Sequence, residues 1–296
     1  MMARSSEATG HSRCGWKQLV SALLLLCVAL HVQAIPRVSV WGAPATVLPE
    51  LRLAQPNVEW QLESSAPADQ LHIAWHAEAY ERLLQQSQRD PILLLSASLS
   101  RRPLVRPQDA ALLWGPPLAQ QVRLARRVMP LAKRIGVLIR RQPDAEAMQA
   151  LVRDVEYIAS AMKADGVVVV PLFMESPISA RAIAEAAERV DIFVASNDEV
   201  LFNRDTAKLI LLTAYRHQRA LIGPTPAFVT AGAVASMAAP KSALLSGLLN
   251  HVERWQKSGR LGSNSSVDHF RPVLNPQVAR SLGLFLTPDL LREAQP

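Results

Sequence analysis

The sequence predicts an α/β fold in which two lobes each contain a mainly parallel sheet. Short apolar runs alternate with amphipathic segments of helical length, which is typical of βαβ units. Some runs are continuously apolar, such as Ile92–Leu95 and Val167–Val170, as expected for strands covered on both faces. Two such blocks, ending near Leu113 and starting near Leu118, are separated by Trp114-Gly-Pro-Pro117, which has the composition of a linker.

Residues 1–34 have the organisation of a cleavable signal peptide. Arg13 and Lys17 form a basic region, Leu19–Leu30 is apolar, and Val32-Gln33-Ala34 supplies the small residues of a cleavage site. A membrane anchor is the alternative, but the apolar run is shorter than the roughly 20 residues that a spanning helix needs. We therefore expect export across the inner membrane and cleavage after Ala34.

Both cysteines, Cys14 and Cys27, lie in this leader. Processing as a lipoprotein at Cys27 is a further alternative, although Leu26 is too large for a good lipoprotein signal. The mature chain would contain no cysteine, which excludes disulfides, cysteine nucleophiles and thiolate metal sites. Such a chain also suits an oxidising compartment, and we expect the periplasm.

The formal net charge of +7 raises the question of nucleic-acid binding. The arginines are scattered in pairs, however, such as Arg101-Arg102, Arg126-Arg127 and Arg140-Arg141. Aromatic residues make up only 5% of the chain, too few for base-stacking platforms. We expect a solvated basic surface and no nucleic-acid partner.

The first block predicts four strands and one helix in order. Alternation or continuous apolar character marks the strands, and helical spacing marks the helix that follows the third of them. The expected strands are Arg37–Trp41, Val58–Leu62, Gln70–Trp75 and Pro91–Ser96, and the expected helix is Ala77–Gln86.

The second block repeats the alternation more clearly. Its long central helix carries an apolar stripe and stops at Gly166, as a C-terminal glycine would require. Ser176 is the expected N-cap of the next helix, with Pro177 at its first position. The expected elements are a helix at 118–133, a strand at 135–139, a helix at 144–163, a strand at 167–172 and a helix ending near 189.

Polar residues gather where the next strands end. The strand Asp191–Ala195 stops at Ser196-Asn197-Asp198, and a helix is expected from Leu201 to His217. The strand Ala220–Gly223 stops at Pro224-Thr225-Pro226, after which another strand is expected. In open parallel sheets ligands bind at the carboxyl ends of strands, so this pattern favours a binding cleft.

The end of the chain carries several motifs in a fixed order. They are Pro272-Val-Leu-Asn275, Ala279, Leu282-Gly-Leu284, Thr287-Pro288 and Leu290-Leu291. This order resembles the closing signature of the periplasmic substrate-binding proteins that serve ABC importers of the tryptophan/tyrosine-type group. Three more places are similar to that family: Met129-Pro130 before Ile135–Leu138, the turn Ser196–Asp198, and Val229 with Gly232-Ala233.

The resemblance covers roughly residues 90 to 291 and implies the type I periplasmic-binding-protein fold, with two Rossmann-like lobes joined by three crossings. It implies lobe one at 35–116 plus 231–266 and lobe two at 117–230 plus 267–296. Lobe one departs from the family. The segment Gly42–Gln55 contains Pro44 and Pro49, so the usual first helix is expected to be missing or reduced, and Pro240-Lys241 replaces a helix-opening glycine.

The expected ligand-binding residues are those at strand ends. Ser98 could offer a hydroxyl to a carboxylate, Asp198 could pair with an α-ammonium group, and a tryptophan could stack on a flat side chain. Asn197 and Asp198 could instead cap a helix, the tryptophans could be buried, and the serines could form a capping turn. The full set is Trp41, Trp75, His76, Ser96, Ser98, Arg140, Asn197, Asp198 and Thr225.

Signals for catalysis or metal binding are weak. His72 and His76 have the spacing of a helical metal pair, but they lie on an expected strand end without a partnering carboxylate. The sequence contains no Gly-x-Ser-x-Gly elbow, no phosphate loop and no Gly-x-Gly-x-x-Gly motif. We therefore expect no metal, no cofactor and no enzymatic activity, with a periplasmic hydrolase as a remote alternative.

The resemblance implies a periplasmic solute-binding protein of an ABC importer. Its ligand would be an amino acid or a similar small carboxylate, and its partner would be an inner-membrane permease. The alternative is a ligand-sensing or protein-interaction module that keeps the same fold and works through a membrane sensor protein.

Overall fold

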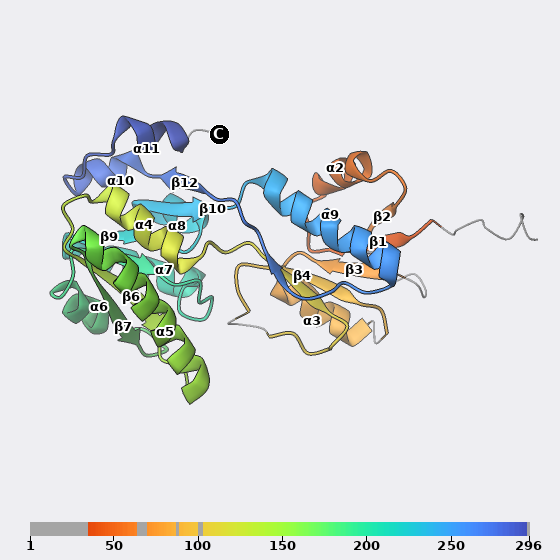
Figure 1. Ribbon diagram of the computed structural model, residues 1–296, viewed down its shortest axis with the longest axis horizontal. Helices are drawn as coiled ribbons and strands as arrows, with labels where there is room; N and C mark the ends of the chain where they lie inside the picture. Colours follow the sequence, from red (N-terminus) through yellow and green to blue (C-terminus); the bar gives the residue numbers. More distant parts are fainter. Residues whose placement is uncertain (1–34, 64–69, 87–88, 100–102, 295–296) are drawn as a thin grey trace, which may run out of the picture. The chain divides into compact units, whose positions relative to one another are not determined.

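The computed structural model describes residues 35–63, 70–86, 89–99 and 103–294. The expected signal peptide at 1–34 lies outside these residues. The described residues form two sheets of six strands each, and each sheet has helices on both faces (Figure 1). Within them, no helix combines the length and the apolar character that crossing a membrane requires.

The first sheet has the strand order β11-β5-β4-β3-β1-β2, and all of its pairings are parallel. Side chains that alternate along its strands face α2 and α9 on one side and α3 on the other. Its strands are β1 (Arg37–Trp41), β2 (Glu59–Leu62), β3 (Gln70–Ala74), β4 (Ile92–Ser96), β5 (Ala110–Leu113) and β11 (Ser265–Ser266), and its helices are α2 (Val47–Ala54), α3 (Ala77–Gln86) and α9 (Lys241–Ser258).

The second sheet has the order β12-β10-β9-β8-β6-β7, and only β12 runs antiparallel to its neighbour. Its strands are β6 (Arg134–Arg140), β7 (Val168–Met174), β8 (Ile192–Ala195), β9 (Ala220–Ile222), β10 (Ala235–Ala238) and β12 (Arg271–Leu274). Its helices are α4 (Leu118–Val128), α5 (Ala145–Met162), α6 (Ala180–Ala187), α7 (Arg204–Arg216), α8 (Pro226–Ala231), α10 (Pro276–Ser281) and α11 (Pro288–Glu293), with a 3-10 turn, η1 (Lys163–Asp165), after α5.

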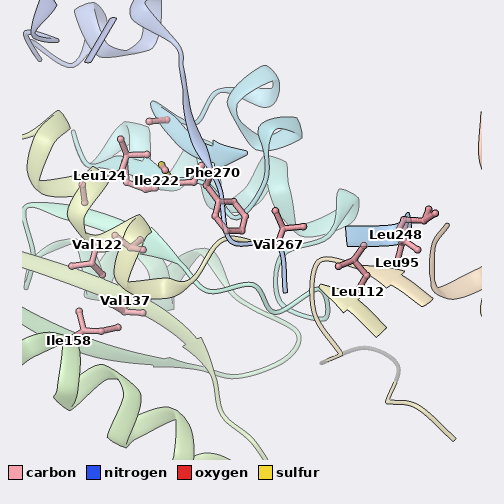
Figure 2. Close-up of a cluster of buried hydrophobic side chains, with 14 of the residues drawn as sticks. Leu95, Leu112, Val122, Leu124, Val137, Ile158, Ile222, Leu248, Val267 and Phe270 are labelled. Carbon is pink, nitrogen blue, oxygen red and sulfur yellow. The ribbon is translucent and has the colours of Figure 1, made fainter. Parts of the chain in front are cut away.

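Alternation along the strands explains how each sheet is covered. In β8, Ile192 and Val194 belong to the apolar cluster that includes α4 and α5, whereas Phe193 and Ala195 belong to the cluster of α6, α7 and α8. Successive side chains of a strand point to opposite faces, so continuously apolar strands need helices on both sides. The larger cluster also contains side chains of the first sheet, together with Val267 and Phe270 between β11 and β12 (Figure 2).

The edge strand β7 has an unusual residue at its centre. Pro171 lies opposite Val137 of β6, in a strand that has a neighbour on one side only. Proline offers no backbone N–H, and sheets tolerate it mainly at such edges.

Two sequence-based expectations about where helices begin were wrong, and one helix was missed. The helix α6 begins at Ala180 with Ser179 as its N-cap, rather than at Pro177 with Ser176 as cap, because the Ser179 side chain accepts from Ala182 N. The helix α7 begins at Arg204 rather than Leu201, because Asn203 forms a capping box. The short helix α8, between β9 and β10, was not predicted.

In the first sheet one expectation is confirmed and one was wrong. The segment expected to have a missing or reduced helix contains a reduced one, α2, of eight residues. We expected the chain to return to lobe one at 231, but β10 pairs with β9 and β12 in the second sheet. The change of sheet therefore comes after Ala238, because β10 extends the parallel ladder of the second sheet.

Candidate ligand-binding site

The expected site residues lie at or just after the carboxyl ends of strands. In the first sheet, Trp41 ends β1, Trp75 and His76 follow β3, Ser96 ends β4, and Ser98 follows it; in the second, Arg140 ends β6, Asn197 and Asp198 follow β8, and Thr225 follows β9. Because the strands that carry them are parallel within each sheet, their carboxyl ends share one edge of that sheet. This edge is where open α/β sheets bind ligands.

Arg140 and Asp198 form a mostly buried ion pair at this edge. Nε of Arg140 donates to Oδ2 of Asp198 at 2.8 Å, and their side chains are only 14% and 8% exposed. The other carboxylate oxygen, Oδ1, accepts from the backbone N–H groups of Val200 and Leu201 at 2.9 and 3.0 Å. Two backbone bonds fix the position of the carboxylate, so it presents a defined negative charge to Arg140.

The side chain of Asp198 acts both as a cap of the turn after β8 and as a partner of Arg140. It caps the turn at Val200 and Leu201, while Asn203 caps the helix α7 itself. Capping and charge pairing therefore coexist in Asp198, because its two oxygens serve different partners. Gln142 adds a longer contact from its Nε2 to Oδ2 of Asp198 at 3.4 Å.

Asn197 joins the end of β8 to Trp114–Pro117, the first crossing between the sheets. Its Nδ2 donates to the carbonyl of Pro116 at 2.6 Å. The amide of Gln121, which is fully buried, lies 3.0 Å from Oδ1 of Asn197, and its other end lies 3.2 and 3.1 Å from the carbonyls of Ala195 and Gly223. The sequence analysis missed Gln121; the only available signal was a polar residue on the buried face of an amphipathic helix.

Gly115 lies where this crossing is most tightly packed. A Cβ atom there would collide with the carbonyl oxygen of Ala97 and would lie 2.9 Å from Nδ2 of Asn197. Ala97 follows β4 and Asn197 follows β8, so the crossing is in contact with residues from the ends of strands in both sheets. Only glycine fits here without displacing backbone atoms.

Ser96 connects β4 to the loop after β8. Its hydroxyl lies 2.6 Å from the carbonyl oxygen of Ser98 and 3.1 Å from Oε1 of Glu199. The first contact is the capping turn that was weighed as the alternative for these serines. Glu199 was not predicted as a site residue, although it directly follows the polar turn Asn197-Asp198.

The aromatic and histidine candidates of the first sheet make local contacts. Trp41 is buried, its Nε1 donates to Oγ of Ser39 at 2.9 Å, and the Arg82 guanidinium lies 5.7 Å from its ring centroid. Trp75 is partly buried against the core. Nδ1 of His76 lies 3.2 Å from Ala79 N and 3.0 Å from Oε2 of Glu78, at the first turn of α3.

Thr225 occupies the N-cap position of α8, and Pro226 follows at the first helical position. Its side chain makes no capping hydrogen bond and is half-buried. Its hydroxyl is therefore not committed to the helix end, in contrast to the side chain of Asn203 on α7.

His72 belongs to a buried polar network. Its Nδ1 lies 2.5 Å from Oγ of Ser39, and its Nε2 lies 3.3 Å from Oδ2 of Asp90. Burial lowers the pKa of His72, while Asp90 acts in the opposite direction. The order Ser39-His72-Asp90 has the connectivity of a catalytic triad, but Ser39 is fully buried in the middle of β1, out of reach of a substrate. Across the described ranges, no three His, Cys, Asp or Glu side chains are grouped as metal ligands would be.

Comparison of the fold with solved structures gives matches along almost the whole chain. An ABC domain from Streptococcus pneumonia in complex with L-Trp matches with a TM-score of 0.60 at 14% identity, covering 88% of this chain and 99% of the other. CD0873, a substrate-binding protein with adhesive properties from Clostridium difficile, was solved ligand-free and open; it matches with a TM-score of 0.58 at 12% identity, covering 86% and 97%.

A conserved domain protein from Vibrio cholerae matches with a TM-score of 0.57 at 17% identity, covering 88% of this chain and 99% of the other. Together with two six-stranded, mainly parallel sheets, these matches decide the fold. The chain has the type I periplasmic-binding-protein fold. No protein-family profile matches the sequence, and no curated protein matches it either.

In the type I periplasmic-binding-protein fold, the site residues lie at the strand ends of two connected sheets. Each lobe of the fold is a Rossmann-like sheet, and three crossings connect the sheets here: Trp114–Pro117, Ala239–Pro240 and Val267–Phe270. Of the sequence-predicted residues, the structure brings Arg140 together with Asp198, and it ties Asn197 to the first crossing. It does not bring Trp41 or His76 into contact with them by any interaction in the described residues.

Proposed function

We propose that this chain is the solute-binding component of an ABC importer and that it binds an amino acid or a similar small carboxylate. Its place of action would be the periplasm, after removal of residues 1–34, and its partner would be an inner-membrane permease. The fold supports a binding role, since it is shared with a substrate-binding protein and with a domain bound to L-Trp. We propose no catalytic role.

The buried ion pair of Arg140 with Asp198 is the observation that supports an amino acid as the ligand. An α-amino acid carries the same two charges, a carboxylate and an ammonium group, so it can satisfy both partners. Arg140 uses Nε toward Asp198, and a guanidinium has five N–H donors in a fixed fork that suits a carboxylate. Asp198, held by two backbone N–H groups, would receive the ammonium group.

Binding at this edge would favour a closed arrangement if the ligand also contacts residues of the first sheet. Ser96 is such a residue: its hydroxyl contacts both the carbonyl oxygen of Ser98 and the Glu199 carboxylate in the loop after β8. A ligand shifts a conformational equilibrium only through its different affinity for the two states. The proposal therefore requires contacts from both sheets.

The test is a calorimetric screen of the purified chain against the amino acids and small carboxylates. For any ligand found, the corresponding amine without the carboxylate and the acid without the amino group are measured as well. The expected result is saturable one-to-one binding that weakens at least tenfold for each truncated ligand, since a charge-assisted hydrogen bond contributes about 1.5–3 kcal/mol.

Two variants test whether Arg140 binds the carboxylate of the ligand. Arg140→Gln should weaken binding of the amino acid about 10- to 100-fold and remove the preference for the carboxylate over the amine. Arg141→Gln is the matched control, because Arg141 is the next residue and its ion pair with Glu175 is mostly exposed, with side chains 56% and 75% accessible. A blank across the whole screen would contradict the proposal and favour the protein-interaction module, which would then be sought by co-purification with a membrane sensor.

A further inference from the structure

A pocket lies at the opposite edge of the first sheet from the candidate ligand-binding site. Its volume is about 440 Å³. Pro91 immediately precedes β4, and Gln108 lies two residues before β5, so the pocket is at the amino ends of these strands. Its other wall is the turn Gly259–Gly262 after α9, and the remaining lining residues are Arg89 and Pro107.

The charged groups of this pocket have one sign. Arg89 and Arg260 both line it, and none of the described residues that line it is an aspartate or glutamate. The acidic residue Asp109, just before β5, is directed to other partners: it accepts from Arg106 at 2.8 and 3.0 Å and from the Tyr80 hydroxyl at 2.7 Å. The carboxylate of Asp109 is therefore already compensated, and Oδ2 of Asp90, between Arg89 and Pro91, lies 3.3 Å from Nε2 of His72. The charged side chains that line the pocket itself are both positive.

The turn that carries Arg260 is held by buried contacts. Leu261 is 1% exposed, and its carbonyl accepts from Nδ1 of His251 at 3.0 Å. Gly262 has φ +79°, and a Cβ atom there would lie 2.5 Å from Nη1 of Arg254, so the chain passes directly against that side chain. The two anchored residues that follow Arg260 thereby restrain its backbone position.

The wall that carries Arg89 is also restrained. Pro91 and Pro107 have fixed φ angles, and Nη2 of Arg106 donates to the carbonyl oxygen of Asp90 at 2.9 Å, next to Arg89. The restrained backbone holds the two cations at the same pocket, so only their side chains have to be ordered when they bind an anion.

We propose that the pocket lined by Arg89 and Arg260 binds a phosphate group, supplied either as a free phosphate compound or as a phospholipid headgroup. Guanidinium groups recognise phosphate oxygens through paired N–H donors, and the amide of Gln108 adds a neutral donor at the same wall. The site is separate from the edge that holds Arg140 and Asp198, and it does not depend on the proposed transport function.

The experiment uses the purified chain in two arms. In the first, inorganic phosphate and glycerol phosphate are titrated and followed by calorimetry and ³¹P NMR. In the second, the chain is sedimented with phosphatidylglycerol vesicles and with phosphatidylcholine vesicles. Saturable one-to-one binding in the first arm supports a soluble phosphate ligand, and selective retention on phosphatidylglycerol supports a lipid headgroup.

The Arg89→Gln/Arg260→Gln double variant should lose at least tenfold in affinity, or lose vesicle retention. Arg123→Gln/Arg280→Gln is the matched control, because it removes the same charge from exposed positions on α4 and α10. The proposal is overturned if neither arm gives binding, or if the control variant loses as much as the pocket variant. Unchanged melting temperatures of both variants exclude loss of folding as the cause.

Discussion

Two buried histidines each join two segments of the first sheet through both ring nitrogens. His72 lies between Ser39 and Asp90, at 2.5 and 3.3 Å. In His251, Nδ1 donates to the carbonyl oxygen of Leu261 at 3.0 Å, and Nε2 lies 2.7 Å from Oγ of Ser265. An acceptor at one nitrogen fixes the tautomer of the neutral ring, so the other nitrogen accepts from the serine hydroxyl.

The pKa of both histidines is lowered, chiefly by burial, with a smaller contribution from Arg106 near His72 and from Arg254 near His251. In the unfolded chain both titrate near the ordinary value of about 6.5. Below that pH the unfolded chain binds more protons than the folded one, so the free energy of unfolding falls as the pH falls. Above it, this contribution is fully retained.

We therefore expect urea denaturation to show decreasing stability from pH 7 to pH 5, by up to about 1.4 kcal/mol per pH unit for each histidine. His72→Gln and His251→Gln should each flatten this slope, whatever their effect on absolute stability. His269→Gln, at an exposed position, should leave the slope as in the wild type. A slope unchanged in both buried-site variants would show that carboxylates govern the acid response instead.

At the scale of single elements, helix caps determine where the chain turns. Asn203 accepts from Asp205 N and Thr206 N at 2.9 and 3.1 Å, while Oγ1 of Thr206 accepts from Asn203 N at 3.2 Å. This capping box satisfies the first free N–H groups of α7. Thr225 occupies the same position on α8 without a side-chain bond, so the two caps form a natural comparison.

Asn203→Ala should lower the free energy of unfolding by about 1–2 kcal/mol, because the N–H groups it satisfies become partly unpaired. Thr225→Ala should change stability by less than about 0.5 kcal/mol. Both are measured by urea denaturation followed by circular dichroism. Equal losses in the two variants would contradict the assignment of the caps, and a loss of ligand affinity in Thr225→Ala alone would place its hydroxyl in the binding site.

The strands were largely predictable because a strand that is buried on both faces has a continuous run of apolar residues, which can be recognised in the sequence. The expected β1 and α3 match the structure, β4 begins one residue later than expected, and β6 is one residue longer at each end. Helix starts were less predictable because several residues can cap, and only packing selects among them, as with Ser179 instead of Ser176. The helix α8 has six residues, too few to produce a periodic pattern.

The candidate site was predictable only as a set of strand ends. The residues were placed by topology, but their partners were not, since Gln121 and Asn197 are 76 residues apart and Ser96 and Glu199 are 103 apart. A sequence pattern carries no information about such pairs. It also could not distinguish a stacking Trp41 from one that donates to Ser39 and lies buried beneath Arg82.

At the scale of the whole molecule, the first crossing connects the two sheets through a close contact. Gly115 touches Ala97 and Asn197, and Pro116 accepts from Asn197. Any side chain at position 115 must push these segments apart. The crossing is therefore a point where a single methyl group can affect how both sheets are held.

Gly115→Ala should destabilise the chain by about 1–3 kcal/mol, because the added methyl meets a backbone carbonyl that cannot move independently. Gly247→Ala is the control: its methyl meets only Leu112 side-chain atoms, at 2.9 and 3.1 Å, and alanine favours the helix α9. We expect the control to stay within about 1 kcal/mol of wild type. Urea denaturation gives both values, and hydrogen exchange at Trp114–Leu118 should rise only in Gly115→Ala.

The proline in the middle of β7 has a consequence for copies of the molecule that meet in solution. Val168–Met174 is an uncharged, almost wholly apolar strand whose outer side has no neighbour in its sheet. Segments of this kind recruit further chains and can seed fibrils. Pro171 interrupts the row of amide donors at its centre, so an incoming strand cannot complete a ladder there. One residue without an N–H thus protects this apolar edge strand from pairing with a strand of another copy.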